Sequence, residues 1–131
     1  MNCIKKIGFA LLALMMMAST LSCGSDDSGA SSKQTLLYKI SLGQGVTLNN
    51  VNFRDADGNF VSVLNPGGST WTKSIEVERP FEGTLDFNIT NTSDTPKTFE
   101  YTISIGSESG TGGGFINPGV TASQGGGFDF D

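Results

Sequence analysis

The stretch Phe99-Glu100-Tyr101-Thr102-Ile103-Ser104-Ile105 decides the fold of this chain, because apolar and polar side chains alternate along its whole length. Successive side chains of a β-strand point to opposite faces, so this period of two places the aromatic residues and isoleucines on one buried face. The same alternation predicts strands around residues 36–42, 46–53, 61–63, 71–77 and 85–89. No window after Cys23 has apolar residues at helical spacing.

The connections between these segments read as turns. Asp55-Ala56-Asp57-Gly58-Asn59 is a strong hairpin signal, and Asn65-Pro66-Gly67-Gly68 closes the following strand. Pro80 cannot donate to a ladder and ends the 71–77 segment. A change of phase at Asn49-Asn50 indicates a bulge or a bend. The pattern predicts an all-β fold, an antiparallel immunoglobulin-like β-sandwich of about seven strands, with an eight-stranded barrel as the competing architecture.

The C-terminal segment is rich in glycine and differs from the rest. Gly112-Gly113-Gly114-Phe115 recurs as Gly125-Gly126-Gly127-Phe128, with the turn Asn117-Pro118-Gly119 between them. This repeat predicts a glycine-rich hairpin in which Phe128 and Phe130 share one face. Glycine costs backbone entropy and has no side chain to pack, so these strands should be the weakest. They form either a mobile edge or an edge that binds a partner by strand addition, with Phe128 and Phe130 as candidate binding residues.

The N-terminal residues have the order of a secretory signal peptide. Lys5 and Lys6 precede an apolar run that is shorter than the about 20 residues of a membrane-spanning helix. The tetrapeptide Thr20-Leu21-Ser22-Cys23 resembles the lipobox of bacterial lipoproteins, in which the cysteine receives acyl chains and becomes the new N-terminus. We therefore expect residues 1–22 to be a lipoprotein signal peptide and Cys23 to be lipidated. The alternative is an ordinary signal peptide with a stray cysteine.

The residues after Cys23 read as a tether. Residues 24–32, GSDDSGASS, have no large apolar side chain to offset the entropy of ordering them. We expect the lipidated cysteine and flexible tether to span residues 23–34 and the β-sandwich domain to span residues 35–131. Asp26 and Asp27 resemble the surface-export signal of lipoproteins in Bacteroidetes-type bacteria, and a solvated linker explains them equally well. The expected location is the outer membrane, with the domain on the cell surface or on the periplasmic face.

Charge and missing residue types exclude several functions. After loss of residues 1–22 the chain keeps 6 basic and all 13 acidic residues, a formal charge of −7. Nucleic acid is not an expected partner, because phosphate contacts need clustered Lys and Arg. The chain has no histidine, and its other cysteine, Cys3, lies in the signal peptide. The usual proton shuttle, zinc or thiolate ligands and a Ser-His-Asp arrangement are therefore missing. We expect no enzyme and no cofactor besides the covalent lipid on Cys23.

Two groups of acidic residues are weaker candidates for a site. Glu76 and Glu78 would lie about 7 Å apart on one strand face, a spacing found in glycosidase carboxylate pairs and also on solvated sheets. Asp55, Asp57 and Asn59 could bind calcium through their oxygen atoms. An Asp-Gly hairpin needs no ion to explain it, so we interpret these three residues as a turn.

Three segments together resemble a group of small exported immunoglobulin-like domains: VNFRDADGNFVSV (51–63), STWTKSIEV (69–77) and TFEYTISIGSES (98–109). Such domains occur in small lipoproteins of Bacteroidetes-type bacteria and are similar to the mycobacterial small membrane proteins that assist lipid and siderophore exporters. The paired cysteines of the mycobacterial proteins are missing here, and the glycine-rich end has no counterpart in them. The residues that carry the likeness are Asp55, Asp57, Gly58, Asn59, Trp71 and Lys73.

These observations predict an envelope lipoprotein, held to the membrane by its lipid, whose β-sandwich is a non-enzymatic binding or structural module. An envelope protein or a glycan is the expected type of partner. The resemblance implies an alternative role as the accessory subunit of an export or uptake system. Trp71 is expected in the core because it shares its phase with Ile75 and Val77, and an exposed sugar-stacking platform is the other possibility.

Overall fold

The structure is a computed structural model that describes residues 32–131 of the 131-residue chain. The predicted signal peptide, Cys23, Asp26 and Asp27 lie outside the described residues. The sandwich domain is one compact unit from Lys33 to Asp131. It has eight strands: β1 (Gln34–Leu42), β2 (Val46–Arg54), β3 (Phe60–Leu64), β4 (Thr70–Val77), β5 (Phe81–Asn91), β6 (Lys97–Ile105), β7 (Glu108–Ile116) and β8 (Thr121–Phe130).

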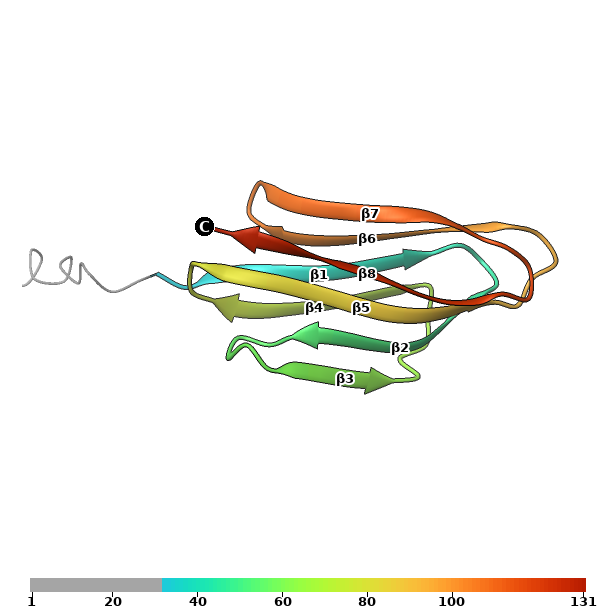
Figure 1. The fold of residues 1–131 in the computed structure, drawn as a ribbon, viewed down its shortest axis with the longest axis horizontal. Coiled ribbons are helices and arrows are strands. Elements are labelled where there is room, and N and C mark those ends of the chain that lie inside the picture. The colour runs from blue at the N-terminus through green and yellow to red at the C-terminus, as the bar shows by residue number, and fades with distance from the viewer. Residues whose placement is uncertain (1–31) are drawn as a thin grey trace, which may run out of the picture. The chain divides into compact units, whose positions relative to one another are not determined.

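The strands form two antiparallel sheets that pack against each other (Figure 1). The first sheet has the order β4-β1-β6-β7 and the second has the order β3-β2-β5-β8. The predicted antiparallel β-sandwich is therefore confirmed. An immunoglobulin constant domain divides seven strands four and three, whereas this chain divides eight strands four and four. The additional strand comes from the glycine-rich segment, which supplies one edge strand to each sheet.

The connections gather at two ends of the sandwich. At the entry end, where β1 begins, lie the β2–β3 hairpin, the β4–β5 and β6–β7 connections and the C-terminus (Figure 1). At the far end lie the connections β1–β2, β3–β4, β5–β6 and β7–β8, each of which crosses from one sheet to the other. Residues far apart in the sequence therefore meet at the entry end.

The core lies between the sheets and contains the side chains that the alternation marked as apolar. The register of β2 against β5 shifts between Leu48 and Asn50, which confirms the predicted bulge. The shift turns Val51 and Phe53 to the same face as Leu48, because one extra residue reverses the phase of a strand. The buried apolar residues are Leu36, Tyr38, Ile40, Leu42, Val46, Leu48, Val51, Phe53, Val77, Leu85, Phe87, Ile89, Phe99, Ile103, Ile105, Ile116 and Phe130.

One polar side chain, Asn91, is buried among the residues that the structure describes. Its Nδ2 donates to the carbonyl oxygens of Thr95 at 2.8 Å and Ile116 at 2.9 Å. Its Oδ1 accepts from the backbone N–H and the hydroxyl of Ser93. The Asn91 side chain thus joins the β5–β6 connection and the last residue of β7 to the end of β5. Within residues 32–131, no helix is long and apolar enough to cross a membrane.

Candidate functional site

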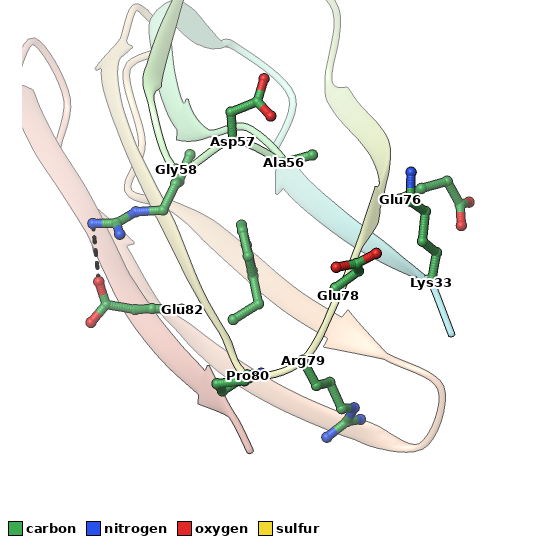
Figure 2. A pocket seen from close by; sticks show the side chains of 11 residues that line it. Lys33, Ala56, Asp57, Gly58, Glu76, Glu78, Arg79, Pro80 and Glu82 are labelled. Atoms are coloured by element: carbon green, nitrogen blue, oxygen red, sulfur yellow. Dashed lines mark ion pairs between the residues drawn. The ribbon is translucent and has the colours of Figure 1, made fainter. Parts of the chain in front are cut away.

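A pocket of about 580 Å³ opens at the entry end of the sandwich (Figure 2). It lies between the β2–β3 hairpin, the end of β4 and the β4–β5 connection, and the first residue of the compact domain, Lys33, closes one side. Most lining residues are charged or are small turn residues. They are Lys33, Arg54, Ala56, Asp57, Gly58, Glu76, Glu78, Arg79, Pro80, Phe81 and Glu82.

Some charged side chains of this pocket form ion pairs, and the others do not. Arg54 forms an ion pair with Glu82 at 3.1 Å, and Arg79 pairs with Glu108 outside the pocket. The lining then retains the carboxylates of Asp57, Glu76 and Glu78 against the one ammonium group of Lys33. The pocket is therefore net acidic, and it suits a cationic group better than a phosphate or a nucleic acid.

Glu76 and Glu78 both line the pocket, and both are exposed on either side of the buried Val77. β4 ends at Val77, so Glu78 already belongs to the connection that leads into Pro80 (Figure 2). Glu76 accepts a hydrogen bond from the Thr35 hydroxyl at 2.7 Å, across the β1–β4 pair. Glu76 is thus held by a neighbouring strand, while Glu78 faces the opening.

The calcium candidates Asp55, Asp57 and Asn59 form the predicted hairpin turn. Asp55 Oδ1 accepts hydrogen bonds from the backbone N–H groups of Asp57 and Asn59, each at 2.9 Å, and the Asp55 N–H donates to the Asn59 carbonyl. Gly58 has φ +85°, a conformation that favours glycine. The Asp55 carboxylate therefore closes the turn, and no cluster of three metal-ligating residues occurs in the stretch 32–131.

Arg79 organises the entry end, a role that the sequence did not reveal. Its guanidinium donates to the Gln34 side chain at the start of β1, to Glu108 at the start of β7 and to the carbonyl oxygen of Asp131. It also lies 5.9 Å from the centre of the Phe130 ring. One cation therefore holds both ends of the described domain, and Figure 2 shows it directed away from the β2–β3 hairpin.

The two glycine repeats do not form the predicted hairpin. β7 pairs with β6 and β8 pairs with β5, so they are edge strands of different sheets on the same side of the sandwich. Aromatic side chains occupy the space between them. A methyl group at Gly110 would overlap the Phe128 ring, and the Tyr101 hydroxyl donates to the Gly125 carbonyl at 2.9 Å. At Gly110, Gly112 and Gly126 the backbone therefore lies close to these rings, where a side chain would overlap them.

Phe128 and Phe130 share one face as predicted, with their ring centres 4.7 Å apart. That face points into the sandwich, and Phe130 is 1% exposed. The prediction that Phe130 binds a partner is therefore wrong, because its ring belongs to the core. Phe128 is partly buried and packs against the same core. Trp71 also packs inward, 5.7 Å from the Phe53 ring, as its phase predicted.

A second hollow lies on the outer face of the first sheet, beside the edge strand β7. It has a volume of about 460 Å³. Phe115 at its border is 78% exposed, the largest exposure among the large apolar side chains that the structure describes. A signal was present in the sequence, because Phe115 has the opposite phase to Ile116, the buried residue that ends β7. The lining residues are Thr98, Phe99, Glu100, Thr111, Gly112, Gly113, Gly114 and Phe115.

Comparisons with protein families, with characterised proteins and with solved structures each found no match. The function must therefore be argued from the entry-end pocket, the outer hollow and the sequence before the first strand. Fold alone would not identify it, since β-sandwiches serve many unrelated functions.

Proposed function

We propose that this chain is a lipoprotein of the bacterial envelope, anchored through lipid on Cys23, whose β-sandwich is a non-enzymatic binding module. The observation that carries the proposal is where the folded domain begins. Lys33 is its first residue and Gln34 opens β1, so only the polar residues 24–32 separate the lipobox cysteine from the sandwich. A short polar tether between a lipidated residue and a compact domain is the arrangement that display of a soluble domain requires.

The charge distribution supports a domain that is held near the membrane by its anchor and does not itself bind the bilayer. The entry end, to which the tether connects, carries eight acidic and three basic residues within residues 33, 54–57, 76–82, 106–108 and 129–131. Anionic headgroups would repel this end, which favours a domain that stands off the bilayer. The four far-end connections contain one charged residue, Asp94. The far end and the sheet faces are then the surfaces that a partner can reach.

The side chains of both hollows support recognition in preference to catalysis. The entry-end pocket offers carboxylates and one ammonium group, and the outer hollow offers one carboxylate, two threonine hydroxyls and an exposed ring. Groups of this kind orient a ligand through hydrogen bonds, charge and stacking. General acid–base catalysis near neutral pH would need a group whose pKa lies near the working pH, and histidine, which usually fills this role, does not occur in the sequence.

Labelling of cells with a palmitate analogue tests the anchor. We expect the wild-type chain to incorporate the label and Cys23→Ser to lose it together with membrane attachment. Cys3→Ser is the matched control, because it removes the other cysteine and should retain the label. A labelled Cys23→Ser chain, or loss of label from Cys3→Ser, would contradict the proposal.

Protease treatment of intact cells tests on which side of the outer membrane the domain lies. If Asp26 and Asp27 act as an export signal, the wild-type domain is digested and a double substitution of these residues by Asn is protected. Equal digestion of both chains would show that the two acids serve only as linker. Lipidation is tested separately, so the anchor and the export signal can fail independently.

A further inference from the structure

Among the strands of residues 32–131, β7 is a sheet edge that lacks the usual protective features. Exposed edge strands offer unpaired backbone N–H and C=O groups, and proteins usually protect them with short length, prolines or charges, especially lysine. On the opposite side of the sandwich, β3 has 5 residues and β4 carries Lys73 in the phase of Trp71 and Ile75. In contrast, β7 has 9 residues, no proline and no basic residue, and its single charge is Glu108 at one end.

The outer hollow adjoins this edge. In the β6–β7 register, Gly113 lies opposite Glu100 and Phe115 lies opposite Thr98. All four residues belong to the outer face, where Glu100, Phe115 and Thr98 are exposed. Gly113 therefore leaves a gap between the Glu100 carboxylate and the Phe115 ring, open towards the free side of β7.

No side chain from residues 32–131 fills this gap. A Cβ atom at Gly113 would lie 2.5 Å from the Phe99 carbonyl oxygen, so any larger residue would displace the backbone of β6. A strand added to β7 would place its outward side chains next to this gap, because directly opposed residues of paired strands share a face. The site thus combines backbone pairing with a place for one side chain.

The chemistry of the gap favours a basic side chain. Glu100 offers a carboxylate, and an exposed aromatic ring such as Phe115 attracts a cation, especially the planar guanidinium group. The domain as a whole has 6 basic and 11 acidic residues, which also attracts a cationic segment. A second copy of β7 does not fit this description, because it would bring Glu108 and no cation.

We propose that the β7 edge binds an extended basic peptide segment of another protein by strand addition, with an Arg or Lys side chain over Gly113 between Glu100 and Phe115. The inference specifies the partner class for the proposed binding role. It does not require the lipid on Cys23, so palmitate labelling and peptide binding can fail separately.

The test is a titration of the full chain in detergent with the fluorescent peptide Thr-Val-Thr-Arg-Thr-Val-Thr. We expect saturable binding that weakens as the salt concentration rises. Binding should also weaken roughly two- to fivefold in Glu100→Gln and in Phe115→Ala. Two control peptides separate the contributions: one has Glu in place of Arg, and one has N-methylated backbone amides that cannot pair with β7. Both should bind far more weakly.

The edge itself is tested with matched lysine substitutions. Thr111→Lys adds a positive charge to the β7 edge and should abolish binding of the peptide. Ser74→Lys adds the same charge to the opposite edge strand β4 and should leave peptide binding unchanged. Thermal unfolding of each variant shows that the exposed substitutions keep the fold. The proposal is overturned if the peptide does not bind at millimolar concentration, or if the N-methylated peptide binds equally well. Binding of neutral oligosaccharides that depends on Phe115, or self-association that depends on Thr111, would replace it with a different partner.

Discussion

At the scale of single residues, we expect stability to depend strongly on Asn91. Its buried side-chain amide joins the β5–β6 loop to the end of β7 by hydrogen bonds. Asn91→Ala removes the amide donor of the Ile116 carbonyl and one of the two side-chain donors of the Thr95 carbonyl, and it removes the acceptor of the Ser93 N–H. We expect a loss of about 2–4 kcal/mol in the free energy of unfolding, since buried polar groups are costly to leave unpaired. Urea unfolding measures it. Asn88→Ala, which removes a more exposed amide on the same strand, should cost less than about 1 kcal/mol; equal losses would contradict the role of Asn91.

The buried hydroxyl of Tyr38 makes a second prediction, on stability at high pH. Burial raises the pKa of Tyr38 from 10.0 to about 12, and the hydroxyl donates to the Arg54 carbonyl at 2.8 Å. The folded state therefore favours the neutral phenol. This contribution is complete below pH 10 and is lost as the pH rises towards 12, because the unfolded chain ionises first. The loss amounts to about 2–3 kcal/mol at about 1.4 kcal/mol per pKa unit.

Guanidinium unfolding between pH 8 and pH 12 measures the effect of Tyr38. Tyr38→Phe should lose about 1 kcal/mol at pH 8, from the missing hydrogen bond, and should show a smaller decline between pH 10 and pH 12. Tyr101→Phe is the control, because the Tyr101 ring is only partly buried. It should retain the decline of the wild-type chain. A Tyr38→Phe variant with an undiminished decline would show that other groups cause it.

At the scale of the strand, the glycines of β7 differ in what surrounds them. An added methyl group at Gly110 would overlap the Phe128 ring, whereas at Gly114 it would lie 3.5 Å from Phe99 Cζ, an ordinary contact. Gly110→Ala should therefore destabilise the domain by about 1–3 kcal/mol through overpacking. Gly114→Ala should stabilise it by about 0.4–1 kcal/mol, because alanine has less backbone freedom to lose on folding. Thermal unfolding of the two variants should shift in opposite directions, and equal shifts would contradict the packing between β7 and β8.

The glycine strands also show what could and could not be predicted from sequence. Alternation marked the core strands, the Asn49-Asn50 bulge and the Asp-Gly hairpin, because each is a local property of the chain. The repeat around Gly112 and Gly125 suggested a hairpin, because neighbouring strands often pair. The two strands belong to different sheets, and the rings of Tyr101 and Phe128 fill the space between them. No local pattern encodes that contact.

The entry-end pocket could not be predicted from the sequence, because it also depends on contacts between distant segments. Its lining comes from the start of β1, the β2–β3 hairpin and the β4–β5 connection, which meet only when the strand order is known. Alternation states which side chains face inward, but it does not state which strands are neighbours. The charges of Arg54, Glu82 and Arg79 were visible in the sequence, and their pairing was not.

At the scale of the whole molecule, acidic residues are concentrated at the entry end of the domain. Arg79 offsets the electrostatic repulsion between them. Eight acidic side chains share the entry end, and Arg79 lies among them with bonds to Gln34, Glu108 and Asp131. Removal of Arg79 therefore has two consequences: the loss of bonds that hold β1, β7 and the C-terminus together, and the loss of a positive charge that offsets repulsion. The two consequences differ in their response to salt, because salt screens charge and leaves packing and hydrogen bonds largely intact.

Comparison of Arg79→Ala with Lys39→Ala separates these consequences, because each variant loses one positive charge and only Arg79 joins the entry-end segments. We expect Arg79→Ala to lower the free energy of unfolding by about 1–3 kcal/mol and Lys39→Ala by less than about 0.5 kcal/mol in low salt. In 0.5 M NaCl the charge contribution shrinks in both variants, and most of the Arg79 deficit should remain. Hydrogen exchange should locate that deficit in β1 and at the end of β8. If salt restores Arg79→Ala to wild-type stability, Arg79 acts only as a charge, and the entry end does not depend on it as a structural joint.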